Sequence, residues 1–177
     1  MSFAVVVAAD SANGIGKDGD LAWRLPGDLA FFRRLTTTAR PGVHNAVVMG
    51  RRTWQSIPAK FRPLPGRLNL VVSRDAAFEP GGRALVATSL EEALARAASE
   101  SDVAAVFVIG GGELYRAALA HPECRAIYLT RIEGTYGCDT FFPALPAAFE
   151  RTEASPRQEE NGIGYVFEIW RRTTSNG

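Results

Sequence analysis

The stretch VFVIGGGELY, residues 106–115, combines an apolar strand, a turn of three glycines and the start of a helix. Glycines at such a turn let backbone N–H groups approach a phosphate closely, at the positive end of the helix. A tight turn with positive φ would explain one glycine more easily than three. The stretch is not GxGxxG, so it is weak evidence for a Rossmann fold. It predicts a strand–turn–helix unit that contacts a phosphate or a dinucleotide.

Similar apolar runs flank this unit on both sides. Continuous Val/Ile/Leu runs of this length are typical of parallel strands that are buried on both faces. The predicted strands are 3–9, 45–50, 68–73, 83–87, 104–110 and 126–132. The predicted helices are 26–36, 51–57, 89–100 and 112–120, the third with a capping box from Ser89 and Glu92. This alternation predicts an α/β sheet with helices on both faces, and the alternating pattern of 163–172 predicts an antiparallel strand.

The composition bounds the class of protein. A chain of 177 residues, 46% hydrophobic and 22% charged, predicts a single domain over 1–177 with a sizeable core. The net charge of +1 gives no strong field for nucleic acid. No apolar stretch approaches the roughly 20 residues of a membrane span, and no positive segment precedes the first apolar run. We therefore expect a cytoplasmic protein with neither a nucleic-acid nor a membrane partner.

Two kinds of chemistry find no support in the motifs. Cys124 and Cys138 do not make a disulfide framework, and no Cys/His cluster has metal-ligand spacing, so no metal is predicted. GxSxG, SxxK and Cys/His arrangements do not occur, which argues against nucleophilic hydrolysis.

Two further strand ends carry anion-binding residue types. In MGRRTWQS, 49–56, a strand ends at Gly50 and a helix begins with Arg51, Arg52 and Thr53. A positive arginine in the first turn of a helix interacts unfavourably with the helix macrodipole, and a bound anion would offset this. The alternative is that both arginines are solvated surface residues. VVSRD, 71–75, ends another strand. Because ligands bind at the carboxyl ends of parallel strands, these ends predict a site for a phosphorylated dinucleotide.

The stretch WRLPGDLAFFRRL, 23–35, places an acid where a helix should be apolar. At 100° per residue, Asp28 falls within the apolar arc. That arc comprises Leu25, Leu29, Phe31, Phe32 and Leu35. A buried carboxylate costs roughly several kcal/mol unless it is paired. Pro26 suits a first turn, however, where the dipole favours an acid by about 0.3–1 kcal/mol. From this stretch alone, a structural and a functional carboxylate remain equally open.

Together these pieces resemble the dihydrofolate reductase family over nearly the whole chain. The resemblance rests on NGIGKDGDLAWRLPGDLAFF (13–32), VVMGRRTWQSIP (47–58), RPLPGRLN (62–69), VVSR (71–74), VIGGGELY (108–115), YLTRI (128–132), DTFFP (139–143) and YVFEIW (165–170). It implies a mainly parallel eight-stranded sheet with flanking helices and an antiparallel C-terminal strand. It also implies a monomeric oxidoreductase that transfers a hydride from NADPH to 7,8-dihydrofolate. The length suits the free-standing enzyme rather than the form fused to thymidylate synthase.

The resemblance assigns the substrate site. Asp28 corresponds to the acid of the pterin pocket, with Trp23 and Thr130 beside it, holding the ring and an ordered water. In that pairing Asp28 lies away from N5, so a water delivers the proton. Arg67 corresponds to the residue that clamps the α-carboxylate of the glutamate tail. The remaining substrate positions are Val7, Ala8, Leu29, Phe32, Ile57, Leu64, Ile109 and Tyr115.

The resemblance also assigns the NADPH site. Ile15 and Gly16 correspond to the loop over the nicotinamide, and Gly110–Gly111 to a cis peptide bond. Arg51, Ser73 and Arg74 correspond to contacts of the 2′-phosphate. The further positions are Ala8, Gly50, Arg52, Thr53, Ile109, Gly112, Glu113, Leu114 and Tyr115.

Three features depart from the family pattern. Ala22 stands where proline is usual, which would loosen the active-site loop. Thr88 stands where a basic residue is expected near the adenine. Binding of the 2′-phosphate would therefore depend more on Arg51 and Arg74. The segment 58–62 is longer than in the shortest bacterial members.

Two other functions fit part of the pattern. A reductase of the same fold that acts on a ribosylaminopyrimidine would also use NADPH, but Asp28 and the loop before Arg67 favour folate. A non-catalytic nucleotide-binding module would keep the glycines and arginines without needing an acid on an apolar helix face.

Overall fold

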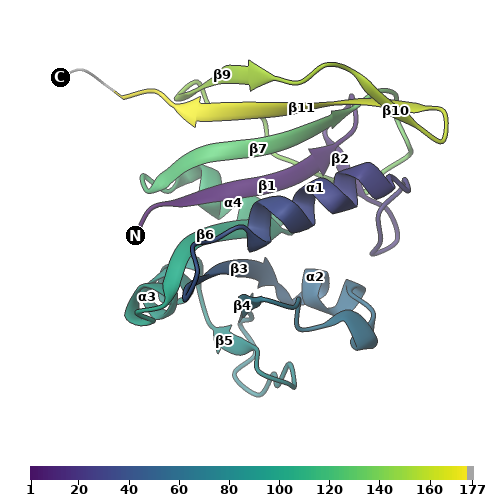
Figure 1. Cartoon of the computed structure of the whole chain (residues 1–177). Coiled ribbons are helices and arrows are strands. Elements are labelled where there is room, and N and C mark those ends of the chain that lie inside the picture. The colour runs from purple at the N-terminus through teal and green to yellow at the C-terminus, as the bar shows by residue number, and fades with distance from the viewer. Residues whose placement is uncertain (175–177) are drawn as a thin grey trace.

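A mainly parallel sheet forms the centre of the molecule (Figure 1). The structure is a computed structural model that describes residues 1–174. Residues 175–177 of the predicted domain lie outside the described residues. Its path runs β10-β11-β7-β1-β6-β3-β4-β5. These strands are β1 (Phe3–Ala9), β3 (His44–Gly50), β4 (Arg67–Val72), β5 (Leu85–Ala87), β6 (Val103–Gly110), β7 (Cys124–Ile132), β10 (Gln158–Glu160) and β11 (Ile163–Arg172). The strands from β7 to β5 along this path pair in parallel, and β11 pairs antiparallel with β7. The predicted fold class is confirmed.

Three strands lie outside this path and outside the sequence predictions. β9 (Phe149–Ala154) is a ninth strand of the main sheet and pairs with β11. β2 (Gly14–Gly16) and β8 (Thr140–Phe141) form a separate antiparallel pair. β10, which is on the path, also lies outside the predictions.

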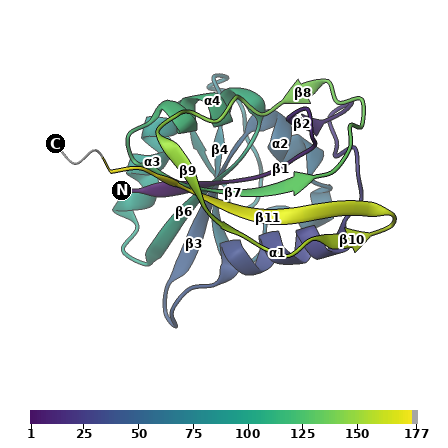
Figure 2. The same ribbon diagram turned by 90° about the horizontal axis from the view of Figure 1, so that it is seen from above.

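Helices cover both faces of the sheet. They are α1 (Pro26–Thr37), α2 (Arg51–Ser56), α3 (Leu90–Ser99) and α4 (Gly112–Ala120), with a 3-10 turn at Ala59–Phe61. Figure 2 shows α1 on one side of the sheet and α4 on the other. Alternate residues of β1 serve the two faces, because successive side chains of a strand point to opposite sides. Val5 and Val7 pack in the core under α3 and α4, whereas Val6 packs in the core with Trp54 of α2.

The predicted capping box of α3 forms in part. The Ser89 hydroxyl accepts a hydrogen bond from the Glu92 amide at 3.1 Å, as expected. The Glu92 carboxylate binds the amide and the hydroxyl of Thr88, both at 2.7 Å, instead of the Ser89 amide. The amide and the hydroxyl of Thr88 lie side by side as two donors, so the Glu92 carboxylate binds them in place of the Ser89 amide.

Candidate active site

A cleft of about 1570 Å³ crosses the carboxyl-end edge of the sheet. The strands β1, β3, β4, β5 and β6 all end at or near it, and its wall includes Ala8, Gly50, Ser73, Thr88 and Gly110 from these ends. This placement agrees with the rule that ligands of open α/β sheets bind outside the carboxyl ends of the strands. Most of the predicted site residues lie in its wall; Trp23 and Arg67 do not.

Asp28 lies in the first turn of α1 and faces the cleft. The Thr130 hydroxyl, from β7, donates a hydrogen bond of 2.6 Å to its Oδ1. Burial raises the pKa of the Asp28 carboxyl; the hydrogen bond from Thr130 opposes that rise, and the charge of Glu160 adds to it. The carboxyl is therefore turned inward and has one protein donor on Oδ1, as the functional interpretation of this acid requires.

Trp23 does not form part of the cleft wall. Its ring is buried in a small core with Leu25, Ile132 and Tyr165, and it meets Tyr136 edge to face. Within residues 1–174 its buried indole N–H has no hydrogen-bond partner. That Trp23 stands beside the acid and helps hold an ordered water therefore stays a prediction, and the ring itself lies in this buried core.

Apolar side chains from β1, α1, β6 and the segment between α2 and β4 line the rest of this end of the cleft. They are Val7, Ala8, Leu29, Phe31, Phe32, Ile57, Leu64 and Ile109. Leu29 is 53% exposed, so the apolar arc predicted for α1 is wrong at this position. Phe32 and Leu35 pack toward the core, and Phe31 stacks on Phe167 at 4.2 Å between ring centroids. Leu29 instead covers the mouth of the cleft.

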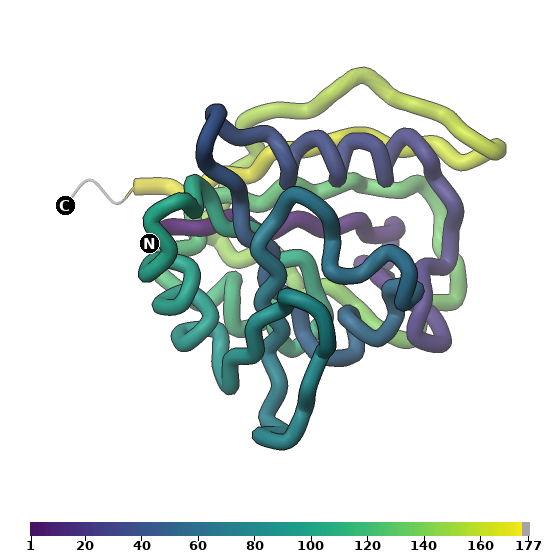
Figure 3. Tube along the Cα trace, turned by 60° about the horizontal axis from the view of Figure 1, so that its bottom comes forward, coloured from purple at the N-terminus to yellow at the C-terminus, as the bar shows by residue number. Residues whose placement is uncertain are grey.

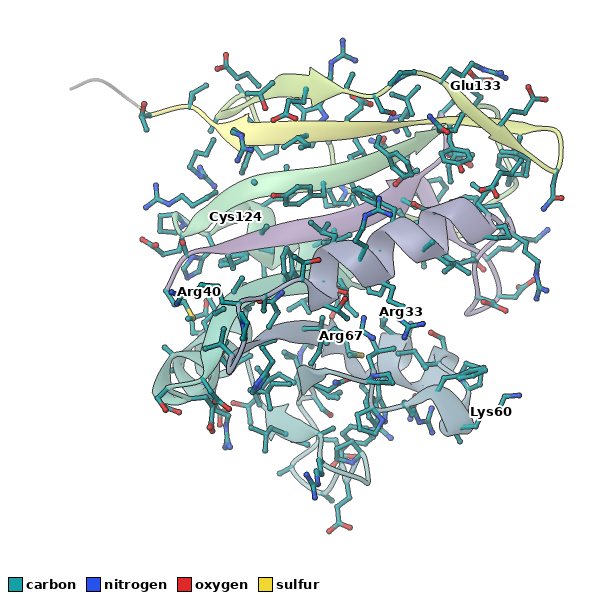
Figure 4. The ribbon with its side chains drawn as sticks, viewed as in Figure 1. Arg33, Arg40, Lys60, Arg67, Cys124 and Glu133 are labelled. Atoms are coloured by element: carbon teal, nitrogen blue, oxygen red, sulfur yellow. The ribbon has the colours of Figure 1, made fainter. Side chains whose placement is uncertain are left out.

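Arg67 begins β4 just beyond this apolar wall. Its Nη1 donates to the Thr36 hydroxyl at 2.9 Å, and its Nε donates to the Pro65 carbonyl at 3.0 Å. The guanidinium carbon lies 5.9 Å from the centre of the Phe32 ring. Burial and the nearby charge of Arg33 lower the pKa of Arg67. Figure 4 shows both arginines between α1 and α2 in this view.

The glycines of the opening stretch form a cradle at the middle of the cleft. The Gly110–Gly111 peptide bond is cis, as the resemblance implied. Gly110 has φ +135°, and a Cβ there would lie 3.3 Å from the Thr53 hydroxyl oxygen and 3.4 Å from that of Tyr115. Tyr115 is buried, and its hydroxyl lies 2.7 Å from the Val6 carbonyl oxygen. Side chains are excluded here, so a ligand can approach the backbone.

Two helix N-termini open into this cradle without a side-chain cap. Gly50 precedes α2 and Gly111 precedes α4, and neither can satisfy the free N–H groups of its helix. Groups of this kind bind anions. The remaining predicted cofactor positions in the wall are Arg52, Thr53, Gly112, Glu113 and Leu114.

The predicted phosphate arginines are held by acids. Arg51 pairs with Asp75 at 3.0 Å and lies over the Phe78 ring, and Arg74 pairs with Glu113 at 3.0 Å. Ser73 is buried, and its hydroxyl accepts a hydrogen bond from the Asp75 amide at 3.2 Å. All three line the cleft, but an anion would have to compete with these carboxylates for the two arginines.

The loop predicted to cover the nicotinamide is tied to a distant segment. Ile15 and Gly16 lie in β2, and the Gly16 carbonyl accepts from the Asp139 amide at 2.9 Å. Beyond them, Asp18 and Gly19 have positive φ in a tight turn between Lys17 and Asp20. Thr140 and Phe141 of β8 therefore reach the cleft wall. The stretch DTFFP (139–143) is part of the family resemblance, but the sequence predicts no site role for Thr140 or Phe141, because their place depends on pairing with β2.

The comparisons with known proteins agree with one another. A family model described as dihydrofolate reductase matches residues 2–172. Bifunctional dihydrofolate reductase–thymidylate synthases of Glycine max and Arabidopsis thaliana are each 44% identical over an alignment of 182 positions, which covers 99% of this chain. The chain spans about a third of the length of these plant relatives (34% and 35%). A dihydrofolate reductase of Heliothis virescens is 39% identical over an alignment of 178 positions, which covers 95% of this chain and 96% of that protein.

Proposed function

Because this chain belongs to the dihydrofolate reductase family, we propose that it reduces 7,8-dihydrofolate to 5,6,7,8-tetrahydrofolate with NADPH as the hydride donor. One observation carries the proposal beyond family membership. An inward-facing carboxyl, Asp28, lies with Thr130 in the same cleft as an open glycine cradle. A pterin needs the carboxyl, and a dinucleotide needs the glycine cradle.

Asp28 is the residue that we expect to hold the pterin. A pterin presents a ring N–H and an amino group side by side, and one carboxylate accepts both hydrogen bonds. Thr130 fixes the direction of the carboxyl through its bond of 2.6 Å. The apolar side chains of the wall, Phe31 and Ile109 among them, would exclude water around a bound pterin and so strengthen that pairing.

Reduction also consumes a proton at N5. Asp28 pairs with the other side of the ring, so we propose that a water delivers the proton. The ionised Asp28 carboxylate holds and polarises the ring while N5 is protonated, and because burial raises the pKa of Asp28, we expect the titration of the Asp28–pterin pair to set the pH dependence of the rate. The rate of hydride transfer should therefore fall as the pH rises through the pKa of this site.

Arg67 is the residue that we expect to bind the α-carboxylate of the glutamate tail. Its two recorded bonds, from Nε and Nη1, fix the plane of the guanidinium beside Phe32. Arginine binds a carboxylate through two parallel N–H donors, and a fixed plane suits that geometry.

The cradle fits the phosphates and nicotinamide of NADPH. A Cβ at Gly110 or Gly111 would stand 3.3–3.4 Å from the Thr53 hydroxyl oxygen and fill the approach. The N-termini of α2 and α4 would hold the phosphates, and Arg51, Ser73 and Arg74 the 2′-phosphate. A reduced nicotinamide supplies the hydride when it is bound. Ile15 and Gly16 would cover that end and exclude water.

We further propose that the protein acts as a cytoplasmic monomer on small molecules. The support is the family resemblance and a net charge of +1, which gives no field for nucleic acid. Among residues 1–174 the structure contains no helix of the length and hydropathy that a bilayer crossing requires.

The direct test is the loss of NADPH absorbance when dihydrofolate is added to the purified protein. We expect turnover that a folate-analogue inhibitor blocks. A ribosylaminopyrimidine substrate serves as the second arm, because a same-fold reductase would turn over that compound instead. Binding of NADPH without turnover of either substrate would favour a non-catalytic module and contradict the proposal.

A further inference from the structure

The first turn of α1, which carries Asp28, has no cap from its own segment. Leu25 stands at the N-cap position and contributes no side-chain hydrogen bond, and Pro26 has no N–H. The cap comes from the other end of the chain. Glu160, the last residue of β10, accepts a hydrogen bond from the Gly27 amide on its Oε1 at 2.8 Å. A carboxylate in this place satisfies a free N–H and complements the helix dipole.

The hairpin of β10 and β11 holds that carboxylate in place. The Tyr165 hydroxyl donates to the same Oε1 of Glu160 at 2.6 Å, and the Tyr165 ring is buried against Trp23 and Leu25. Burial and Glu160 raise the pKa of Tyr165 to about 12, so the hydroxyl remains a donor. Asn161, in the turn, donates from Nδ2 to the Arg24 carbonyl at 3.2 Å. Figure 3 shows this hairpin alongside α1.

Gly27 is shaped for this contact. A Cβ at Gly27 would lie 2.6 Å from both the Glu160 Oε1 and the Tyr165 hydroxyl oxygen. Gly27 is not among the glycines with positive φ, so close approach rather than backbone conformation requires glycine at this position. The hairpin and the helix turn therefore fit each other at three points: Arg24, Gly27 and the buried ring core.

Few titratable groups act on Asp28. The charge of Glu160, on β10, raises the pKa of Asp28, and the charge of Asp28 in turn raises the pKa values of Tyr165 on β11 and Tyr115 on α4, both of which burial keeps neutral. β1 contributes no titratable side chain. Arg131, next to Thr130 on β7, donates instead to the Asp10 carbonyl at 2.8 Å. Among residues 1–174, Glu160 is thus the charged side chain that acts on the pKa of Asp28.

We propose that Glu160 is a positioning residue for Asp28: it fixes the first turn of α1 against the cleft and places a second negative charge beside the Asp28 carboxyl. The inference rests on the proposed function, in which Asp28 holds the pterin. Its consequence is that a residue outside the cleft wall sets both the placement of the acid and the pH at which it loses its proton. Like charge disfavours ionisation, so Glu160 extends the protonated form of Asp28 to higher pH.

Three variants separate the two roles. Glu160→Gln removes the charge, while its amide oxygen still accepts from Gly27 and Tyr165. Glu160→Ala removes the charge and the cap. Glu159→Gln is the matched control: it removes a negative charge one residue away on the same strand, from a side chain that pairs with Arg157 at 3.0 Å on the other side.

The first readout is a carboxyl NMR titration of the protein without ligands, with the Asp28 signal assigned through Asp28→Asn. We expect the Asp28 titration to move to lower pH in Glu160→Gln and to stay unchanged in Glu159→Gln. The second readout is the pH profile of hydride transfer, which should move in the same direction in the same variant. A purely structural cap would move neither. If Asp28 titrates alike in both Gln variants, the charge role is overturned.

The third readout is steady-state kinetics at a single pH, chosen below the pH at which the rate of hydride transfer begins to fall in wild type and in Glu160→Gln. Glu160→Ala should raise the KM for dihydrofolate about threefold or more, because the first turn of α1 loses the acceptor that caps it and Asp28 is held less firmly against the cleft. Glu160→Gln should restore it, and unchanged KM in Glu160→Ala overturns the positioning role. If Glu160→Ala fails to fold, Tyr165→Phe, which removes only the hydroxyl donor, takes its place. A wild-type protein that does not reduce dihydrofolate would refute the proposed function, whereas the NMR titration would still decide whether Glu160 acts on Asp28.

Discussion

The Thr130 hydroxyl and the Asp28 carboxyl, 102 residues apart in the chain, are joined by a hydrogen bond of 2.6 Å. The bond connects β7 to the first turn of α1 across the cleft. It answers the question raised by an acid on an apolar helix face. The helix dipole accounts for its place along the axis, and the cleft accounts for the direction of its side chain.

Asp28→Asn should lower hydride transfer by orders of magnitude near neutral pH and leave NADPH binding largely intact. An amide cannot accept both pterin hydrogen bonds as a carboxylate does, and it has no negative charge to polarise the ring. Single-turnover kinetics with saturating NADPH measure the step, and fluorescence titration measures cofactor binding. Near-normal turnover in the variant would remove Asp28 from the chemistry.

The same substitution should stabilise the fold. Burial raises the folded-state pKa of Asp28 above its ordinary value of 3.8, so the folded protein binds this proton more tightly than the unfolded chain. The stability contributed by that proton is complete below pH 3.8 and is lost as the pH rises through the folded-state pKa. Removing the buried charge should raise the free energy of unfolding by about 0.5–2 kcal/mol at neutral pH. The lost interaction with the helix dipole, about 0.3–1 kcal/mol, reduces this gain.

Urea unfolding of wild type and Asp28→Asn between pH 4 and 8 measures this difference. We expect the gap between the two proteins to widen as the pH rises. Glu100→Gln, at an exposed position, is the control, and its free energy of unfolding should equal that of wild type at every pH. A variant less stable than wild type at every pH would show that the acid is structural.

Arg67→Ala should raise the KM for dihydrofolate by roughly 10–100-fold with little change in kcat. Hydrogen bonds to a charged group contribute about 1.5–3 kcal/mol, and the tail is remote from the reacting atoms, so its binding is uniform. Arg33→Ala, which removes the neighbouring exposed charge, should have a much smaller effect. A pterin substrate without the glutamate tail should be insensitive to both variants. If it responds to Arg67→Ala as dihydrofolate does, Arg67 acts on the fold of the pocket.

Much of the fold could be predicted because its patterns are local. The strands β1 and β11 begin and end where the sequence predicts, since an apolar run and a polar–apolar alternation are both read within ten residues. β9 could not be predicted, because only Phe149 of its six residues is buried and no apolar pattern remains. Its order comes from pairing with β11.

The site shows the same division. The strand-end glycines and arginines are visible in the sequence, and the structure brings Gly50, Arg51 and Gly110 to one cleft. The sequence does not show that Asp75 holds Arg51, since an ion pair across 24 residues depends on how two loops meet. Nor does it show that Trp23 turns into a buried core instead of toward the cleft.

Arg51→Ala should lower the preference for NADPH over NADH by roughly 10–100-fold, through a higher KM for NADPH alone. The loss corresponds to the about 1.5–3 kcal/mol of a charged hydrogen bond to the 2′-phosphate. Asp75→Asn is the informative partner, because it frees Arg51 from its ion pair of 3.0 Å and should strengthen NADPH binding. KM values for both cofactors in the three proteins test the pair. Wild-type discrimination in Arg51→Ala would assign the phosphate to Arg74.

Gly110→Ala should abolish cofactor binding while leaving a folded but less stable protein. The backbone there has φ +135°, which L side chains rarely adopt, and the new methyl group would stand 3.3 Å from the Thr53 oxygen and 3.4 Å from the Tyr115 oxygen. Strain of this kind costs about 1–3 kcal/mol. Gly42→Ala is the matched control, because Gly42 also has positive φ but has open space around its Cβ position. Both variants should lose stability in thermal unfolding, and only Gly110→Ala should lose NADPH binding, since only Gly110 lies in the cleft. Equal NADPH affinity in the two variants would mean that the cradle does not contact the cofactor.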